Sequence, residues 1–151
     1  MGYIQELRTF VGSRPLIMNG SCVVVVDQEG RLLLQLRADN GKWGLPGGAM
    51  ELGESFEETA SRELLEETGI QAENMELLDI TSGKDLYFRY PNGDEVYMIL
   101  ASFVCNTYSG ALTSDDDEVL DIRFFEISSL PDQLHIPDVP VIYNYIARSV
   151  R

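Results

Sequence analysis

The sequence predicts an α+β fold in a single domain, and three observations lead to this prediction. The 151 residues suffice for one hydrophobic core but not for two domains of usual size. Strand-like apolar runs recur along the chain, with helical patterns at both ends and one between them. The run VVVV at residues 23–26 has no polar residue, which indicates a strand buried on both faces of a layered sheet.

The first predicted elements are a short helix and a β-hairpin. The helix is expected over residues 4–11, before Gly12. Its apolar stripe is formed by Ile4, Leu7, Phe10 and Val11. Strand-like runs at residues 21–27 and 31–37 follow, separated by the polar turn 28–30, so we expect the two strands to pair as a hairpin.

A loop and a capped helix come next. Residues 38–54 are rich in glycine and contain Pro46, which predicts a loop. Ser55 and Glu58 match a capping box, in which the two side chains satisfy free N–H groups at the start of a helix. Gly69 is suited to end the same helix, because glycine readily adopts the left-handed conformation found there. We therefore expect a helix between Ser55 and Gly69.

The second half of the chain is predicted to hold more strands and a final helix. Strand-like runs occupy residues 75–82, 85–90, 95–105 and 119–127. The sequence PNGD, directly before the third of these runs, is a hairpin-turn signal. The last helix is expected to open near Asp138 and Pro140. Its apolar stripe consists of Val141, Ile142, Tyr145 and Ile146.

The chain is strongly acidic, with 25 Asp and Glu against 11 Lys and Arg and a formal net charge of -14. Duplex nucleic acid and anionic membranes are therefore not expected partners, because both are bound mainly through Lys and Arg. The same field repels a small phosphorylated substrate, unless a bound divalent cation reverses the sign at the site.

Localisation is predicted from the cysteines and the N-terminus. Cys22 and Cys105 have no CxxC spacing and are expected to be free and buried, as in a reducing compartment. The N-terminus lacks the apolar segment of a secretion signal, and the longest apolar run, CVVVV, is too short to span a bilayer. We therefore expect a cytoplasmic protein.

Glu63, Glu66 and Glu67 share one face of the central helix, because residues at i, i+3 and i+4 are neighbours on a helix. Each like-charge pair costs a few tenths of a kcal/mol on an exposed helix, and Arg62 is placed at i+4 to relieve only Glu66. Solvation of an exposed face is the ordinary explanation of such a run. A cation bound among the carboxylates is the other explanation.

The surroundings of these glutamates resemble a known motif. Gly48, five residues, Glu54, seven residues and then RELLEETGI match the Nudix box, GX5EX7REUXEEXGU with U an apolar residue, at every defined position. The match covers the 23 residues from Gly48 to Ile70. The resemblance implies one Nudix hydrolase domain over residues 1–151. It also implies an α/β/α sandwich with a mixed β-sheet between helices.

The resemblance also implies roles for the residues of the box. Glu66 and Glu67 match the principal ligands of Mg²⁺ or Mn²⁺, often joined by the backbone carbonyl at the position of Gly48. Glu63 matches a position that serves as a further ligand or as the base. The remaining two, Glu54 and Arg62, match residues that orient the catalytic helix. Carboxylate oxygens are suited to these hard cations.

Three predictions lie outside the box. The acidic run at residues 115–118 precedes a strand, and many Nudix enzymes supply a further carboxylate from such a loop, for which Glu118 is our choice as ligand or base. Tyr87 falls where the family's diadenosine-polyphosphate hydrolases often have Tyr; it either stacks on a base or packs in the core. His135, the one histidine, is expected to be a surface or packed residue, not a catalytic one.

The expected activity is hydrolysis of the pyrophosphate bond in a nucleoside diphosphate linked to another group X, with Mg²⁺ or Mn²⁺ as cofactor. The identity of X is left open, and the substrate classes considered are nucleoside triphosphates, dinucleoside polyphosphates and nucleotide sugars. Leu86 stands where ADP-ribose hydrolases of the family often carry Pro, and the Arg-rich stretch of the coenzyme A type is lacking.

Two alternatives to the enzyme remain from the sequence. One is a nucleotide-binding sensor or scaffold on the same fold, and the other is an acidic domain that acts through a partner surface. The helices at the two ends are expected to pack on the sheet of the same chain, although a homodimer formed through them stays open.

Overall fold

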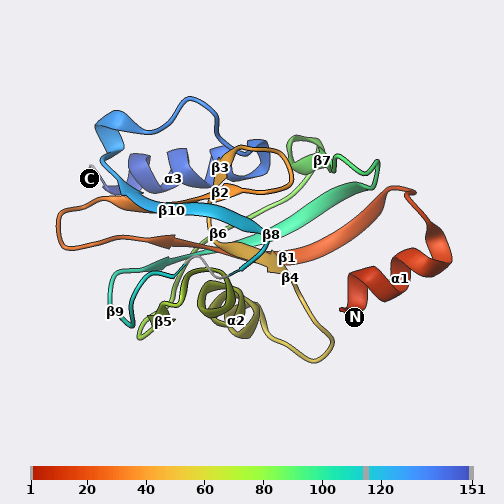
Figure 1. The fold of residues 1–151 in the computed structure, drawn as a ribbon, viewed down its shortest axis with the longest axis horizontal. Helices are drawn as coiled ribbons and strands as arrows, with labels where there is room; N and C mark the ends of the chain where they lie inside the picture. The colour runs from red at the N-terminus through yellow and green to blue at the C-terminus, as the bar shows by residue number, and fades with distance from the viewer. Residues whose placement is uncertain (1, 114–115, 150–151) are drawn as a thin grey trace.

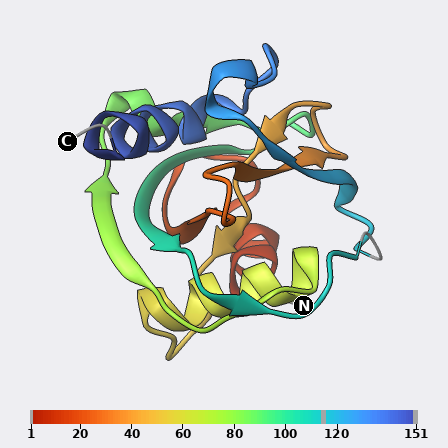
Figure 2. The same ribbon diagram turned by 90° about the vertical axis from the view of Figure 1, so that its left-hand side faces the viewer.

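The protein is described by a computed structural model over residues 2–113 and 116–149. Its β-sheets lie between helix α2 (Phe56–Thr68) on one side and helix α3 (Val139–Ser149) on the other (Figure 1 and Figure 2). The sandwich with a mixed β-sheet between helices, predicted from the sequence, is confirmed.

The larger sheet has the strand order β4-β1-β8-β6, and β7 also pairs with β8. Its strands are β1 (Leu16–Val25), β4 (Gly47–Ala49), β6 (Glu76–Thr81), β7 (Tyr87–Arg89) and β8 (Glu95–Cys105). β1 and β8 run parallel, and the other pairs are antiparallel. The hairpin predicted at PNGD is confirmed, since the N–H of Tyr90 donates to the carbonyl of Asp94 at 2.8 Å between β7 and β8.

The smaller sheet is antiparallel and has the order β10-β2-β3. It consists of β2 (Leu32–Arg37), β3 (Trp43–Gly44) and β10 (Val119–Phe125). Two further short strands, β5 (Gln71–Ala72) and β9 (Tyr108–Ser109), pair with each other. Short 3-10 helices occupy Lys84–Leu86 (η1), Ile127–Ser129 (η2) and Ile136–Asp138 (η3).

The predicted hairpin of residues 21–37 is wrong beyond its turn. The turn itself forms, with the N–H of Asp27 donating to the carbonyl of Arg31 at 3.1 Å, and one bridge joins Val26 to Leu32. From there β1 enters the larger sheet and β2 enters the smaller one. The reason is that β1 pairs along its whole length with β8, a partner far away in sequence that no local turn signal reports.

The predicted loop of residues 38–54 contains two short strands, β3 and β4. Gly47 lies opposite Cys22 of β1. A Cβ at Gly47 would lie 2.3 Å from the carbonyl oxygen of Ser21, so no side chain fits there. The glycines thus permit a close approach of two backbones as well as a change of direction.

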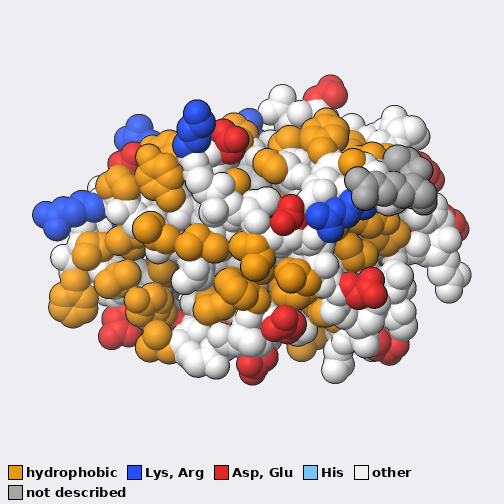
Figure 3. All heavy atoms as spheres, turned by 180° about the vertical axis from the view of Figure 1, so that it is seen from behind, with side chains coloured by type: hydrophobic (Ala, Val, Ile, Leu, Met, Phe, Trp, Pro, Cys, Tyr) orange, Lys and Arg blue, Asp and Glu red, His pale blue; other side chains and the backbone are white. Residues whose placement is uncertain are grey.

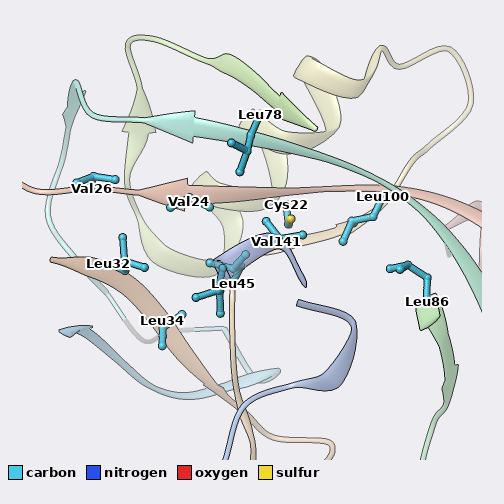
Figure 4. Packing of buried hydrophobic residues seen from close by; sticks show 11 residues of the cluster. Cys22, Val24, Val26, Leu32, Leu34, Leu45, Leu78, Leu86, Leu100 and Val141 are labelled. Atoms are coloured by element: carbon cyan, nitrogen blue, oxygen red, sulfur yellow. The ribbon is translucent and has the colours of Figure 1, made fainter. Parts of the chain in front are cut away.

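Alternate residues at the end of β1, and Val26 directly after it, face two layers of the core. Val23 and Val25 belong to the cluster covered by α2, and Val24 and Val26 belong to the cluster covered by α3. All four are buried, so the predicted burial on both faces is confirmed. Figure 4 shows the second cluster, to which strands of both sheets and α3 contribute Val24, Leu32, Leu34, Leu100 and Val141.

Helix α2 begins and ends as predicted. The Ser55 hydroxyl accepts from the N–H of Glu58 at 3.1 Å, and Glu58 accepts from the N–H of Ser55 at 3.1 Å. Gly69 ends the helix in the left-handed conformation, with a φ of 80°. Because both ends are fixed, the less exposed glutamates of α2, Glu63 and Glu67, have a defined direction toward the sheets.

The helices at the two ends of the chain differ in their packing. Val141 and Ile142 of α3 are buried, as predicted. Helix α1 (Tyr3–Val11) forms where predicted, but none of its side chains is buried and Phe10 is 81% exposed. The expectation that the apolar stripe of α1 packs on its own sheet is confirmed only in part, because Ile4, Leu7 and Val11 are half-buried while Phe10 is exposed. It projects from one end of the molecule (Figure 1).

The reverse side of the molecule carries a band of apolar side chains, edged by acidic ones (Figure 3). Exposed apolar side chains of the larger sheet are Ile17, Leu77, Ile80 and Tyr97.

Within the described residues, no helix is both long and apolar enough to cross a membrane. The homodimer formed through the helices at the two ends of the chain stays a prediction.

Two glycines with similar backbone conformations are expected to respond differently to alanine. Gly53 and Gly69 have φ values of 85° and 80°. A Cβ at Gly53 meets nothing within 4 Å, so Gly53→Ala should cost about 1–2 kcal/mol from backbone strain alone. At Gly69 it would lie 2.4 Å from the methyl carbon of Thr113, so Gly69→Ala should cost clearly more. Urea unfolding measures both, and equal losses would contradict this account.

Candidate active site

A cleft with a volume of about 1060 Å³ opens between α2 and the sheets. Its walls come from α1, β1, β2, β4, β8, α2, the segment 116–118 and η3. Most of the predicted site residues line it, namely Gly48, Arg62, Glu63, Glu66, Glu67 and Glu118. The structure therefore brings together residues from the box and from the acidic segment before β10.

Helix α2 approaches the backbone of β4 very closely. The N–H of Gly47 donates to Oε1 of Glu67 at 2.8 Å. A Cβ at Gly48 would lie 2.5 Å from the carboxyl carbon of Glu63. Glycine at position 48 is therefore required for Glu63 to lie against this main chain, while Gly47 permits the approach to β1.

Glu67 and Glu63 are carboxyl groups withdrawn from water. Glu67 is 5% exposed, and burial, followed by the charge of Glu63, raises its pKa to about 8. Burial also raises the pKa of Glu63 to about 7, although Arg62 opposes this effect. The pKa of Glu118 is raised as well, first by burial and then by the charge of Asp116.

Arg62 organises the edge of this group. Its guanidinium makes ion pairs with Glu54 at 2.7 Å and Glu63 at 2.8 Å, a longer one with Glu66 at 3.4 Å, and a hydrogen bond to the carbonyl of Ala49 at 3.0 Å. Hydrogen bonding from Arg62 lowers the pKa of Glu54 to about 2. Glu54 thus fixes Arg62 from outside the cleft, which is consistent with the orienting role predicted for both.

The donor set fits a hard divalent cation, but the ligands are not fully gathered. In the described part of the chain, no three His, Cys, Asp or Glu residues are arranged around one point as a metal site. The side chain of Glu66 is 54% exposed and is turned to Arg62. Glu63, Glu67 and the backbone of Gly48 nevertheless offer oxygen donors alone, as Mg²⁺ and Mn²⁺ prefer.

Tyr87 does not join the other predicted site residues. Its hydroxyl donates to Glu95 and its ring lies 5.2 Å from that of Tyr97, outside the lining of the cleft. Tyr90, the next tyrosine along the chain, lines the cleft instead.

The acidic segment is described only in part. Asp115 lies outside the described residues. Asp116 and Asp117 line the cleft beside Glu118, and Oδ1 of Asp116 accepts from the N–H of Glu118 at 2.8 Å. This hydrogen bond fixes the backbone from which Glu118 reaches the cleft.

Sequence reasoning missed several residues of the opposite wall. Arg37 pairs with Asp39 at 2.7 Å. Asp138 accepts from the N–H of Leu45 at 2.9 Å, and burial raises its pKa to about 6. His135 lines the same wall, although it was not missed: it is packed, as predicted. Burial lowers its pKa to about 3, so its imidazole is neutral.

Gln35 was also missed, and for this residue the sequence carried a signal. It is the one polar residue in LLLQL, yet it is 3% exposed. Its Nε2 donates to Oε2 of Glu67 at 2.9 Å. A buried amide in an apolar strand has to find a partner, so this position could have been included as a candidate.

The raised pKa values of Glu63 and Glu67 predict how stability depends on pH without metal. Their folded values, about 7 and 8, exceed the ordinary 4.5, so their contribution is present below pH 4.5 and is lost as the pH rises to about 8. In a chelator the Tm should fall over this range, and Mn²⁺ should restore it. Glu67→Gln should flatten the fall; a Tm that does not respond to pH or Mn²⁺ would contradict this.

Comparison with known proteins agrees with the geometry. The NUDIX domain model matches residues 17–146. The chain is 34% identical over 113 residues to a putative mutator protein MutT4 of Mycobacterium tuberculosis, covering 75% of this chain but 40% of that protein. It is 33% identical to an ADP-ribose pyrophosphatase of Methanocaldococcus jannaschii, covering 81% of this chain and 69% of that protein.

A solved structure gives the same result. The crystal structure of a MutT NUDIX hydrolase from Burkholderia pseudomallei has a TM-score of 0.74 and 26% identity, over 85% of this chain and 98% of that one. The match over residues 17–146 includes the whole box and the sheets that flank it. This chain therefore belongs to the Nudix family.

Proposed function

We propose that this protein is a metal-dependent hydrolase that cuts the pyrophosphate bond of a nucleoside diphosphate linked to another group. One observation carries the proposal. Two carboxyl groups, the half-buried Glu63 and the buried Glu67, lie against the Gly47–Gly48 backbone in a cleft of about 1060 Å³. A cleft of this volume is large enough for a nucleotide derivative.

The surroundings of Glu67 support a cation at this place. Its two oxygens receive hydrogen bonds from neutral donors, the amide of Gln35 and the N–H of Gly47. In the described structure no Lys or Arg is paired with Glu67, although Arg62 pairs with Glu63. A buried carboxylate with no positive partner is costly unless a cation is bound. Bound Mg²⁺ or Mn²⁺ would supply that charge, neutralise phosphate oxygens and lower the pKa of an attacking water.

The residues of the chain then divide the tasks. Glu67, Glu66 after leaving Arg62, and the carbonyl of Gly48 would hold the cation, with Glu63 as a further ligand or as the base. The proton of the attacking water would go to Glu63 or Glu118, since both carry a raised pKa beside the cleft. Arg62 and Glu54 keep the direction of Glu63 fixed.

The cleft also has apolar side chains that suit the organic part of the substrate. Arg8 and Arg37 line it as well, each in an ion pair with an acidic neighbour, Asp94 and Asp39. The apolar lining includes Met18, Leu45, Val96, Met98 and Leu100. We propose that a base or sugar lies here while the phosphates lie near α2.

The group X is proposed only as a class. The name of one relative refers to ADP-ribose, yet Leu86 stands where the ADP-ribose hydrolases of the family often carry Pro. Nucleoside triphosphates, dinucleoside polyphosphates and nucleotide sugars all present the required diphosphate. The net charge of -14 disfavours a nucleic-acid duplex or an anionic membrane as a partner, and a bound cation would offset it locally for a small phosphorylated ligand. We propose that the protein acts in the cytoplasm.

An activity assay separates this proposal from a nucleotide-binding sensor. Wild-type protein should convert at least one member of a nucleotide panel to a nucleoside monophosphate and the phosphorylated form of X, and only with Mg²⁺ or Mn²⁺ present. Glu67→Gln should lower kcat at least about 100-fold, because a buried ligand is lost. Glu57→Gln, on the same helix but exposed, controls for the change of charge. Nucleotide binding without any product would favour the sensor.

A further inference from the structure

Gln35 lies at the floor of the cleft, on the face of β2 that turns toward α2. Leu33, two residues earlier on the same face, belongs to the core cluster that contains Leu64 of α2. Gln35 itself is 3% exposed and lines the cleft. A leucine at this position would continue the apolar strand, so the amide requires a separate explanation.

The amide fixes one side of the Glu67 carboxylate. Nε2 of Gln35 donates to Oε2 of Glu67 at 2.9 Å, while the N–H of Gly47 donates to Oε1 at 2.8 Å. Each oxygen therefore has one donor from the protein and keeps a further lone pair. Rotation of the carboxylate would break one of these two hydrogen bonds.

The same contact leaves the carbonyl oxygen of Gln35 without a partner. Oε1 is buried and accepts no hydrogen bond from any described residue. With a cation bound, Glu67 is ionised and only accepts, so a flipped amide would place its oxygen against another acceptor. A buried acceptor in this state loses free energy unless a donor reaches it. Because Gln35 lines the cleft, a water molecule in the cleft is the donor that we consider.

We propose that Gln35 is a positioning residue for the cation site: it holds Glu67 in its binding orientation, and its free carbonyl oxygen accepts from a water molecule of the occupied site. This inference rests on the proposed function, in which Glu67 is a ligand of a divalent cation. Residues that hydrogen-bond to a metal ligand commonly affect the affinity for the metal, which falls when they are lost. Gln35 is such a residue, since it hydrogen-bonds to Glu67.

The test is Mn²⁺ binding to the full chain, measured by calorimetry without nucleotide. Gln35→Met keeps the length of the side chain but removes the hydrogen bond to Glu67 and the acceptor for the proposed water, and it should weaken Mn²⁺ binding about tenfold or more. Leu34→Met is the matched control, because Leu34 is buried on the opposite face of β2 and does not line the cleft. It should bind Mn²⁺ as the wild type does.

A kinetic measurement separates positioning from a merely structural role. In Gln35→Met the Mn²⁺ concentration for half-maximal hydrolysis should rise about tenfold. A variant that is only less folded would lose kcat with this concentration unchanged, and that result would overturn the proposal. If Gln35→Met does not fold, Gln35→Asn gives the same test, since its amide is one methylene too short to reach Glu67.

The outcomes for the two proposals differ. Equal Mn²⁺ affinity in the wild type, Gln35→Met and Leu34→Met would overturn the role of Gln35 and leave the metal-dependent hydrolase standing. A wild type that neither binds Mn²⁺ nor hydrolyses any nucleotide would contradict the proposed function itself.

Discussion

The close approach of helix α2 to the backbone of β4 is the constraint on which the rest of the site depends. Side chains at Gly47 or Gly48 would overlap the backbone of β1 or the carboxyl group of Glu63. Because neither residue has a side chain, β4 can pair with β1, and helix α2 can bring Glu63 and Glu67 against the main chain of β4. The capping box at Ser55 and the left-handed Gly69 then fix where the helix begins and ends.

This approach has an electrostatic consequence. Carboxyl groups that would be solvated on an exposed helix are drawn into a region of low dielectric, and their pKa values rise. Arg62 balances Glu54 and Glu63, while neutral groups alone hold Glu67. A site with surplus negative charge and oxygen donors suits a divalent cation. The acidic chain can then accept phosphates that its own field would otherwise repel.

The parts of the site that the sequence predicted are those specified locally. Helix α2, its caps and the face shared by Glu63 and Glu67 follow from helical spacing and short-range hydrogen bonds. Residue pairings across the fold could not be predicted in this way, so the turn after β1 suggested a hairpin although β1 joins β8. Gln35 and Asp138 were missed for the same reason, because their partners lie on other elements.

The most direct test is a crystal structure with Mn²⁺, in which the metal is located by its anomalous scattering. The account predicts a peak about 2 Å from oxygens of Glu63, Glu67 and the carbonyl of Gly48, with Glu66 moved from Arg62 toward it. A structure from Mn²⁺-saturated crystals with no peak among these oxygens would contradict it.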